Sequence, residues 1–330
     1  MRLRSALAAS LTVGLVGLAT ACSETPADPT GLRPEKSTIT VARMPIPDCA
    51  TLKIAQDKGY FSREGLKVDA SEIQSGGLAF APLQGGSLDI SIGNYVSTIA
   101  AQAQGAGPFQ FLNDAYQAAP GTFVVMVPKT SKAQELKDLR GKRIAVAALH
   151  SIITLGVENG LATAGLKASD VQMVPMALPQ MIAAAVTGQV DAVVLVEPFI
   201  SAFATQHGAR EIYDLMSGSM ANFPIAGWMT TVEFAKKNPK TVAAFQRAME
   251  AAQADAARDP DLVENAIPKY TRIEANIASN IRLGTFPVSL EPIRIQRVAD
   301  RMKELGYLDT PMDVTLLLAG SGATPAVKAS

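Results

Sequence analysis

The stretch VQMVPMALPQMIAAAVTGQVDAVVLVEPF, residues 171–199, decides the fold. It predicts a strand over 171–175, a helix over 178–187 that ends at Gly188, and a buried strand over 192–196. A strand, a helix and a second strand in this order are typical of parallel α/β sheets. The stretch therefore predicts an α/β protein.

The same alternation continues upstream of this stretch, whereas the sequence beyond Trp228 is mainly helical. Amphipathic patterns there predict one helix that begins at Pro239 and cannot extend past Pro260, and another from Ser289 to Gly306. This C-terminal third has no sheet of its own and must pack on one formed by earlier residues. Upstream, strands are expected at 38–42, 66–72, 89–92, 109–112, 122–127 and 143–147, and helices at 48–57, from the loop 75–77 to about 85, at 96–104 and from 151 onward.

Composition narrows the class of protein. The chain has 330 residues, of which 48% are hydrophobic, and its 30 Lys and Arg balance 30 Asp and Glu. This length predicts two ordinary domains or one large one. A chain with a net charge of zero does not have the excess of basic residues that nucleic-acid binding needs. Its two Cys and two His are too few for a zinc or iron–sulfur site. We expect no metal, no cofactor and no nucleic-acid partner.

Residues 1–21 have the features of an export signal. Arg2 and Arg4 form a basic start, and the apolar run over 6–18 is too short to span a bilayer. Small residues at 19–21 complete the pattern of a cleavage site. We therefore expect the mature protein to be exported.

The position after the predicted cleavage site is a cysteine, Cys22. Small residues before a cysteine resemble a bacterial lipobox, although Leu18 lies one place further out than the usual leucine. We favour lipidation of Cys22, with 22–36 as a flexible tether that holds the protein at the outer face of the cell membrane. The alternative is a soluble exported protein with a disulfide between Cys22 and Cys49.

Five segments, in this order and spacing behind an export signal, match one family. They are KGYFSREGL (58–66), LQGGSLDISIGN (83–94), LKDLRGKRIAVA (136–147), GQVDAVVLVEPF (188–199) and NPKTVAAFQRAMEAAQ (238–253). Together they resemble the NMT1/THI5-like solute-binding proteins of ABC importers, which include nitrate, sulfonate, taurine and thiamine-pyrimidine receptors. The resemblance runs from about residue 38 to about residue 308.

The resemblance implies a two-lobe fold of the type II periplasmic-binding-protein kind, in which each lobe is a mostly parallel sheet flanked by helices. Two hinge crossings would let the lobes close on a small-molecule ligand, and the partners would be an ABC permease and its ATPase. We expect a monomer. The expected parts are the signal peptide 1–21, the tether 22–36, lobe 1 at 37–122 and 227–320, lobe 2 at 123–226 and a frayed tail at 321–330, with crossings near 122–127 and 225–231.

Candidate ligand-binding residues lie in the loops that follow the predicted strands. In open α/β sheets the ligand crevice lies beyond the carboxyl ends of the strands, where helix N-termini present free N–H groups. This rule selects the loops 45–49, 74–77, 94–97, 149–152 and 196–199. The candidates are Gln74, Ser75, Gly76, Gly77, Asn94, Tyr95, Ser97, His150, Ser151, Glu197 and, just after the second crossing, Trp228.

Several candidates also have a purely structural interpretation. Ser97 could cap a helix and His150 could be an ordinary surface histidine. Glu197 follows a buried strand, where a carboxylate is costly unless it meets the ligand, a partner or the other lobe. Trp228 could belong to the core, and Asp48 is either a helix cap, which we favour, or a ligand acceptor.

The five loops contain no Arg or Lys. Recognition of a small anion would then depend on helix N-termini and neutral donors, with His150 as the one titratable cation. A carboxylate at Glu197 with Tyr95, Trp228 and Phe199 would suit a polar heterocycle with amino groups. The expected solute is therefore a sulfonate- or nitrate-type anion or a pyrimidine-like heterocycle. No nucleophile, phosphate-loop or dinucleotide fingerprint occurs in a fitting context, and we expect no catalytic residue. The alternatives are a THI5-like pyrimidine-synthesis enzyme, whose Cys-rich motif is missing here, and a ligand sensor not coupled to transport.

Overall fold

The computed structural model describes residues 33–319. The expected signal peptide, Cys22, most of the tether and the tail therefore lie outside the described residues. Within that range the chain forms two five-stranded sheets, each with helices packed on it. No helix among residues 33–319 has the length and apolar character needed to cross a membrane.

The first sheet has the strand order β2-β1-β3-β10-β4. Strand β1 pairs in parallel with β2 and β3, while β10 is antiparallel to both β3 and β4, so four of the five strands run in one direction. Ile39 and Val41 on β1 are fully buried, as the alternation of the sequence predicts. The strands are β1 (Thr38–Arg43), β2 (Lys67–Glu72), β3 (Ile90–Asn94), β4 (Phe109–Gln117) and β10 (Pro224–Thr231).

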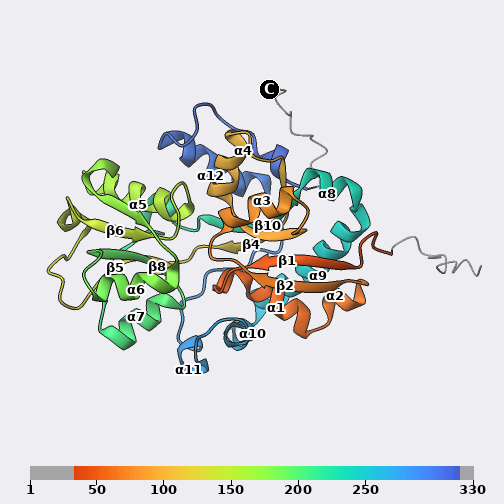
Figure 1. Cartoon of the computed structure of the whole chain (residues 1–330), viewed down its shortest axis with the longest axis horizontal. Helices are drawn as coiled ribbons and strands as arrows, with labels where there is room; N and C mark the ends of the chain where they lie inside the picture. The colour runs from red at the N-terminus through yellow and green to blue at the C-terminus, as the bar shows by residue number, and fades with distance from the viewer. Residues whose placement is uncertain (1–32, 320–330) are drawn as a thin grey trace, which may run out of the picture. The chain divides into compact units, whose positions relative to one another are not determined.

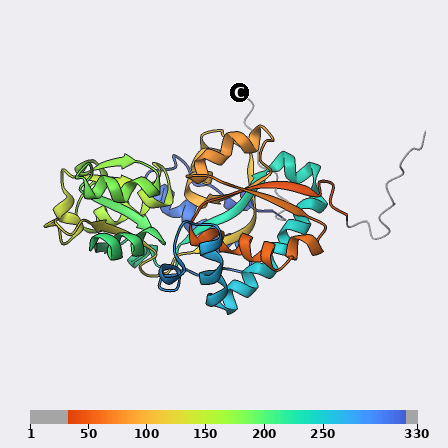
Figure 2. The ribbon, with the colours of Figure 1, turned by 60° about the horizontal axis from the view of Figure 1, so that its bottom comes forward.

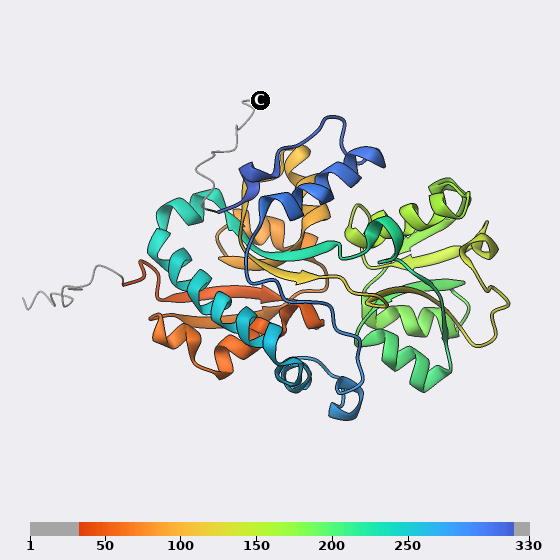
Figure 3. The same cartoon turned by 180° about the vertical axis from the view of Figure 1, so that it is seen from behind.

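The C-terminal helices cover this first sheet, as their lack of strands requires. The long helix α9 packs against α1 and α2, where the rings of Phe61 and Phe245 stack at 5.6 Å, and α12 packs against α4 (Figures 1 and 3). We call this sheet and its helices lobe 1. The helices are α1 (Ala50–Asp57), α2 (Tyr60–Arg63), α3 (Phe80–Gln84), α4 (Tyr95–Ala103), α8 (Val232–Lys237), α9 (Pro239–Arg258), α10 (Pro260–Ala266), α11 (Ala275–Ala278) and α12 (Pro292–Glu304), with single 3-10 turns η1 (Pro47–Cys49), η2 (Gly76–Ala79), η6 (Ile267–Lys269) and η7 (Val314–Leu317).

The second sheet, which with its helices we call lobe 2, has the order β7-β6-β8-β5-β9. Here β5 is the strand that runs against the others, and helices lie on both faces of the sheet (Figures 1 and 2). The predicted α/β class, with two mostly parallel sheets, is confirmed. The elements are β5 (Phe123–Val127), β6 (Arg143–Val146), β7 (Gln172–Pro175), β8 (Ala192–Val196), β9 (Arg210–Asp214), α5 (Ile152–Thr163), α6 (Leu178–Val186) and α7 (Phe199–His207), with 3-10 turns η3 (Leu136–Leu139), η4 (Ala168–Asp170) and η5 (Gly218–Met220).

The chain passes between the sheets at positions that differ from those expected. It leaves β4 at Gln117 and enters β5 at Phe123, and it leaves β9 at Asp214 and enters β10 at Pro224. The expected crossing at 225–231 is wrong, because those residues pair with β3 on one side and β4 on the other and so form an interior strand. The expected crossing at 122–127 likewise overlaps β5.

A third segment, after α11, also touches both lobes (Figure 3). Thr285 and Gln117 exchange backbone hydrogen bonds of 2.9 and 3.0 Å on the lobe 1 side. Arg282 reaches lobe 2, where its backbone N–H donates to Glu197 at 3.2 Å and its guanidinium pairs with Glu211 at 2.6 Å. This segment therefore runs beside the first crossing, where Gln117 and Gly121 lie.

Candidate functional site

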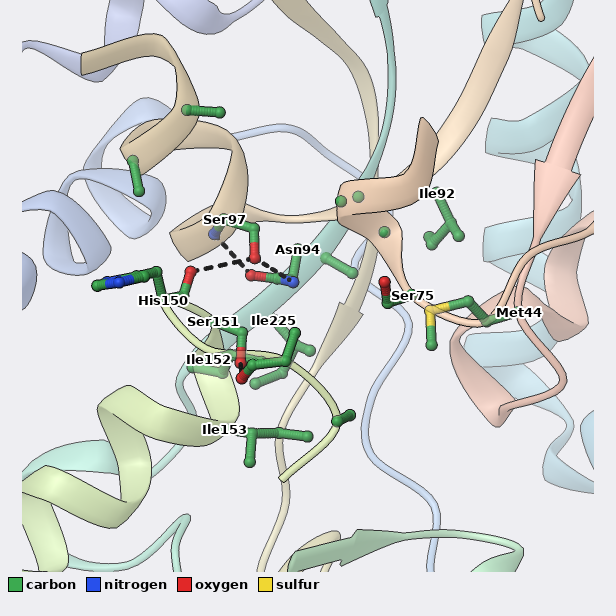
Figure 4. A pocket seen from close by; sticks show the side chains of 18 of the residues that line it. Met44, Ser75, Ile92, Asn94, Ser97, His150, Ser151, Ile152, Ile153 and Ile225 are labelled. Carbon is green, nitrogen blue, oxygen red and sulfur yellow. Dashed lines mark hydrogen bonds between the residues drawn. The ribbon is translucent and has the colours of Figure 1, made fainter. Parts of the chain in front are cut away.

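A cavity of about 370 Å³ opens at the carboxyl ends of strands from both lobes. Met44 directly follows β1, Asn94 ends β3, Ala147 follows β6, and Val196 ends β8, and all four line the cavity. This is where the strand-end rule places a ligand, and the volume lies within the range of small-molecule sites. Figure 4 shows the cavity with side chains from lobe 1 and lobe 2 on opposite sides.

Most of the cavity wall is apolar. Lobe 1 and lobe 2 contribute aliphatic, aromatic and thioether side chains in similar numbers, and several of them surround the space in Figure 4. No Lys or Arg is among the lining residues. The larger apolar residues of the wall are Met44, Ile46, Phe80, Ile92, Phe123, Leu149, Ile152, Ile153, Leu178, Val196 and Ile225.

Asn94 and Ser97 form a polar patch on the lobe 1 side of the cavity. The Asn94 side-chain oxygen accepts the Ser97 N–H at 2.8 Å, which makes Asn94 the N-cap of α4. The Ser97 hydroxyl donates to the backbone oxygen of His150 at 3.3 Å and so links the two lobes across the cavity (Figure 4). The residue that caps α4 is thus Asn94 and not Ser97, which the sequence suggested as a cap. Both residues line the cavity.

His150 and Ser151 form the corresponding corner of lobe 2. Ser151 begins α5, where its N–H donates to the Thr154 hydroxyl at 3.0 Å and its own hydroxyl donates to Ala148 O at 2.8 Å. His150 has a positive φ of 50°, and its ring lies edge-on to Tyr307 at 6.0 Å. Figure 4 shows this imidazole directed away from Ser75. His150 therefore meets lobe 1 in two ways: its backbone oxygen accepts from Ser97, and its ring packs on Tyr307, which follows α12.

Ser75, Gly76 and Gly77 lie on the opposite wall, at the start of η2. Gly76 lies beside Gly93, and a Cβ at Gly76 would make an ordinary contact of 3.5 Å with the Gly93 Cα. Gly93 is the tighter position, because a Cβ there would lie 2.6 Å from the Met229 sulfur.

Asp48 is the acidic side chain of the cavity wall. It lies in η1 with only 4% of its surface exposed. Burial raises the pKa of Asp48 to about 7, and its own backbone N–H is the hydrogen-bond donor that opposes this rise. The site therefore combines apolar walls, neutral donors and one carboxyl group whose charge changes near neutral pH.

Two aromatic candidates belong to the core instead of the site. Tyr95 is fully buried with its ring 4.6 Å from that of Phe111, and Trp228 is fully buried and edge-on to Phe245 at 6.2 Å. Neither lines the cavity. Both rings pack within lobe 1, that of Tyr95 against β4 and that of Trp228 against α9.

Two polar candidates also lie outside the cavity wall. Glu197 is buried and accepts hydrogen bonds from Ser201 N at 3.1 Å, Ser201 Oγ at 3.0 Å and Arg282 N at 3.2 Å. Of its expected roles, the structure places Glu197 in the contact between lobes rather than against a ligand. Gln74 is exposed because it precedes η2, and its side-chain amide donates to the Glu72 carboxylate at 3.4 Å.

Sequence reasoning missed most of the apolar wall. Ile92, Ile153 and Leu178 come from the same apolar runs as fully buried core residues, such as Ile90. Their positions at the ends of strands and starts of helices are the only signal that could have separated them. Among residues 33–319 no group of three His, Cys, Asp or Glu is placed to hold a metal ion.

Comparisons with known proteins agree with this architecture. The taurine-binding periplasmic protein of Escherichia coli (strain K12) is 28% identical over 71% of this chain and 70% of its own length. The 4-amino-5-hydroxymethyl-2-methylpyrimidine phosphate synthase of Schizosaccharomyces pombe is 25% identical over 63% of this chain and 61% of its own. The structure of the alkanesulfonate-binding protein SsuA from Xanthomonas axonopodis pv. citri bound to MOPS aligns with a TM-score of 0.71 at 19% identity, covering 86% of this chain and 98% of that one. The model of the family described as NMT1/THI5 like matches residues 46–262, more than half of the sequence, and the chain belongs to that family.

Proposed function

We propose that this protein is the substrate-binding component of an ABC importer, which captures a small organic solute between its lobes and delivers it to a permease. The observation that carries the proposal is the cavity of about 370 Å³, lined by loops of both lobes at the carboxyl ends of their strands. A site shared by two lobes couples ligand binding to their relative movement, and a permease can sense that movement.

The N-terminal sequence supports a location outside the cytoplasm. In this proposal residues 1–21 direct export, and Cys22 carries a lipid that anchors a monomer to the outer face of the cell membrane. The intact mass of the membrane-bound protein tests the anchor, because an acylated Cys22 adds the mass of its lipid. An unmodified Cys22 would contradict it.

The cavity favours a ligand that is not a strong anion. Two of the three named relatives are a taurine-binding and an alkanesulfonate-binding protein, whereas the cavity of this chain is lined by no Lys or Arg and contains the carboxyl group of Asp48. A buried anion without a cationic partner is costly. A neutral or cationic organic solute, such as an amino-substituted heterocycle, fits this wall better than nitrate or a sulfonate.

A pyrimidine-synthesis enzyme is the second candidate, and the similarity to the yeast synthase is the observation that favours it. Against it, the one cysteine of residues 33–319, Cys49, is buried and lies outside the cavity wall. A sensor that reports the solute without importing it would use the same site. Neighbouring genes for a permease and an ATPase would distinguish an importer from a sensor.

Ligand binding is tested by thermal unfolding of the full chain with a panel of sulfonates, nitrate, pyrimidines and flavin-like compounds. Binding at 100 times Kd stabilises a protein by about 2.7 kcal/mol, so a true ligand should raise Tm clearly. The variant Ala148→Trp places an indole in the cavity wall and should abolish the shift. Ala70→Trp, on an exposed position of β2, is the matched control and should keep it. Turnover of a solute without any stabilising ligand would refute the binding role.

A further inference from the structure

We infer that Asp48 is the ligand-recognising carboxylate of the cavity, and that the solute has an apolar body carrying one cationic amine. This inference rests on the proposed function, because it presupposes that the cavity holds a transported solute. The inference concerns which solute is bound. Its test is arranged so that the assignment of Asp48 and the proposed receptor function can fail separately.

Asp48 differs from the other buried carboxylates of residues 33–319 in lacking a partner from another residue. Asp89 pairs with Lys36 and Asp114 with Arg294, each at 2.7 Å, and Asp255 pairs with Lys58 at the same distance. Glu197, the fifth, accepts three hydrogen bonds. For Asp48 the donor is its own backbone N–H. In this position Asp48 either takes up a proton, as its raised pKa indicates, or stays ionised when a donor enters the cavity and binds it.

The ionisable groups around Asp48 do not supply that partner. Cys49 beside it, Tyr116 on β4 and Tyr270 after η6 are all buried, and burial raises the pKa of each side chain. The Tyr270 hydroxyl donates to Ile46 O at 2.8 Å, and the Tyr116 hydroxyl accepts the Gly284 N–H. Arg43, the nearby cation, donates to Tyr270 O at 3.0 Å and lies over the Tyr270 ring.

The wall around Asp48 defines the rest of the ligand. The cavity is lined by Met44, Ile46 and Phe80 near Asp48 in sequence or on the same lobe, and by Ile152, Ile153 and Leu178 from lobe 2. These surfaces favour a hydrocarbon or aromatic body. An ammonium group would donate to the carboxylate and neutralise it, whereas a sulfonate or carboxylate would meet a like charge in a wall that has no Lys or Arg and only His150 as a titratable base.

Three probes with one body test this assignment: 2-phenylethylamine, 2-phenylethanol and 2-phenylethanesulfonate. By calorimetry on the full chain at about pH 8, we expect the amine to bind at least about tenfold more tightly than the alcohol, and the sulfonate not to bind. Asp48→Asn should remove this advantage and leave the alcohol within about twofold of its original affinity. Asp57→Asn is the control. It removes an exposed carboxylate paired with Lys53 and Lys269, and it should change neither the affinity for the amine nor that for the alcohol.

The pH dependence gives a second readout that needs no variant. The amine binds the ionised carboxylate, so its affinity should fall as the pH drops through the range in which Asp48 takes up a proton. With a pKa of about 7, the ionised fraction falls by roughly 30-fold between about pH 8 and about pH 5.5, which sets the largest expected loss. The alcohol should show no such loss. If Asp48→Asn does not fold, comparing the pH dependence of amine and alcohol binding to the natural chain still tests the assignment of Asp48.

The outcomes separate the two proposals. An amine that binds no more tightly than the alcohol, or equally well at both pH values, overturns the assignment of Asp48. Failure of all three probes overturns the amine class as well. The receptor proposal survives either result if a panel solute stabilises the natural chain but not Ala148→Trp, and it fails if no solute does.

Discussion

Replacing Arg294 with glutamine should destabilise the protein strongly, because this residue neutralises a carboxylate in the core of lobe 1. Arg294, on α12, donates to Asp114 Oδ2 at 2.7 Å and to Gln117 Oε1 at 2.7 and 3.2 Å. The Asp114 side chain is 0% exposed and that of Arg294 only 19% exposed. Breaking a buried pair by removing one partner costs about 3–5 kcal/mol. Since glutamine keeps one possible donor, we expect about 3 kcal/mol at pH near 8.

The loss should be smaller in acid. Burial raises the pKa of Asp114 to about 6 even though Arg294 lowers it, so removing Arg294 raises the pKa further. A raised pKa means that the folded state holds a proton that the unfolded state has released, and stability then falls as the pH rises through that range. This fall is steeper in the variant. The difference between variant and natural protein should therefore shrink by at least about 1 kcal/mol between about pH 8 and about pH 5.

Urea unfolding measures both the loss of stability at high pH and its decrease in acid. The unfolding is followed by the fluorescence of Trp228, the only tryptophan, which is fully buried in lobe 1. Arg301→Gln on the same helix is the control, because its partner Glu304 is exposed and the expected cost is under about 1 kcal/mol. The double variant Asp114→Asn with Arg294→Gln should be more stable than Arg294→Gln alone. A loss below about 1 kcal/mol at high pH, or an equal loss at both pH values, would refute the argument.

Two further predictions concern the core. Gly227→Ala should cost about 3 kcal/mol in urea unfolding, since the new Cβ would lie 2.8 Å from the Asn113 backbone oxygen; a cost near zero would mean that β4 and β10 separate easily. In a Cys22→Ser variant, the remaining thiol, Cys49, should not react with a thiol reagent until the protein unfolds, because it is buried and burial raises its pKa; fast reaction of the folded protein would contradict this.

Parallel strands such as β3 and β8 are predicted from the sequence because each is a short apolar run bounded by a turn. The strands β9 and β10 are harder to predict, since β10 has apolar residues without a following crossover helix and resembles a linker between lobes. Its place in the sheet depends on pairing with β3 and β4, which are separated from it by more than a hundred residues along the chain. Such pairing leaves little local signal.

The same limit applies to the site. The strand-end rule selects polar loops whose residues Asn94, Ser97 and Ser151 line the cavity. It did not predict the direction of each side chain, and Tyr95, next to Asn94, turns into the core. Asp48 was recognised as a possible acceptor, but the cap interpretation was favoured because its missing partner is visible only in three dimensions.

The segment that joins α11 to α12 has a mechanical consequence. Two connections between rigid bodies define an axis, but they leave each body free to twist slightly about the other. The contacts of Thr285 with Gln117 and of Arg282 with Glu197 and Glu211 add a third point of attachment. Three attachments oppose shear and torsion more than simple bending, so motion should follow a single arc. Along that arc, the Arg282 contacts would limit how far the two lobes open, because wider opening requires these contacts to break.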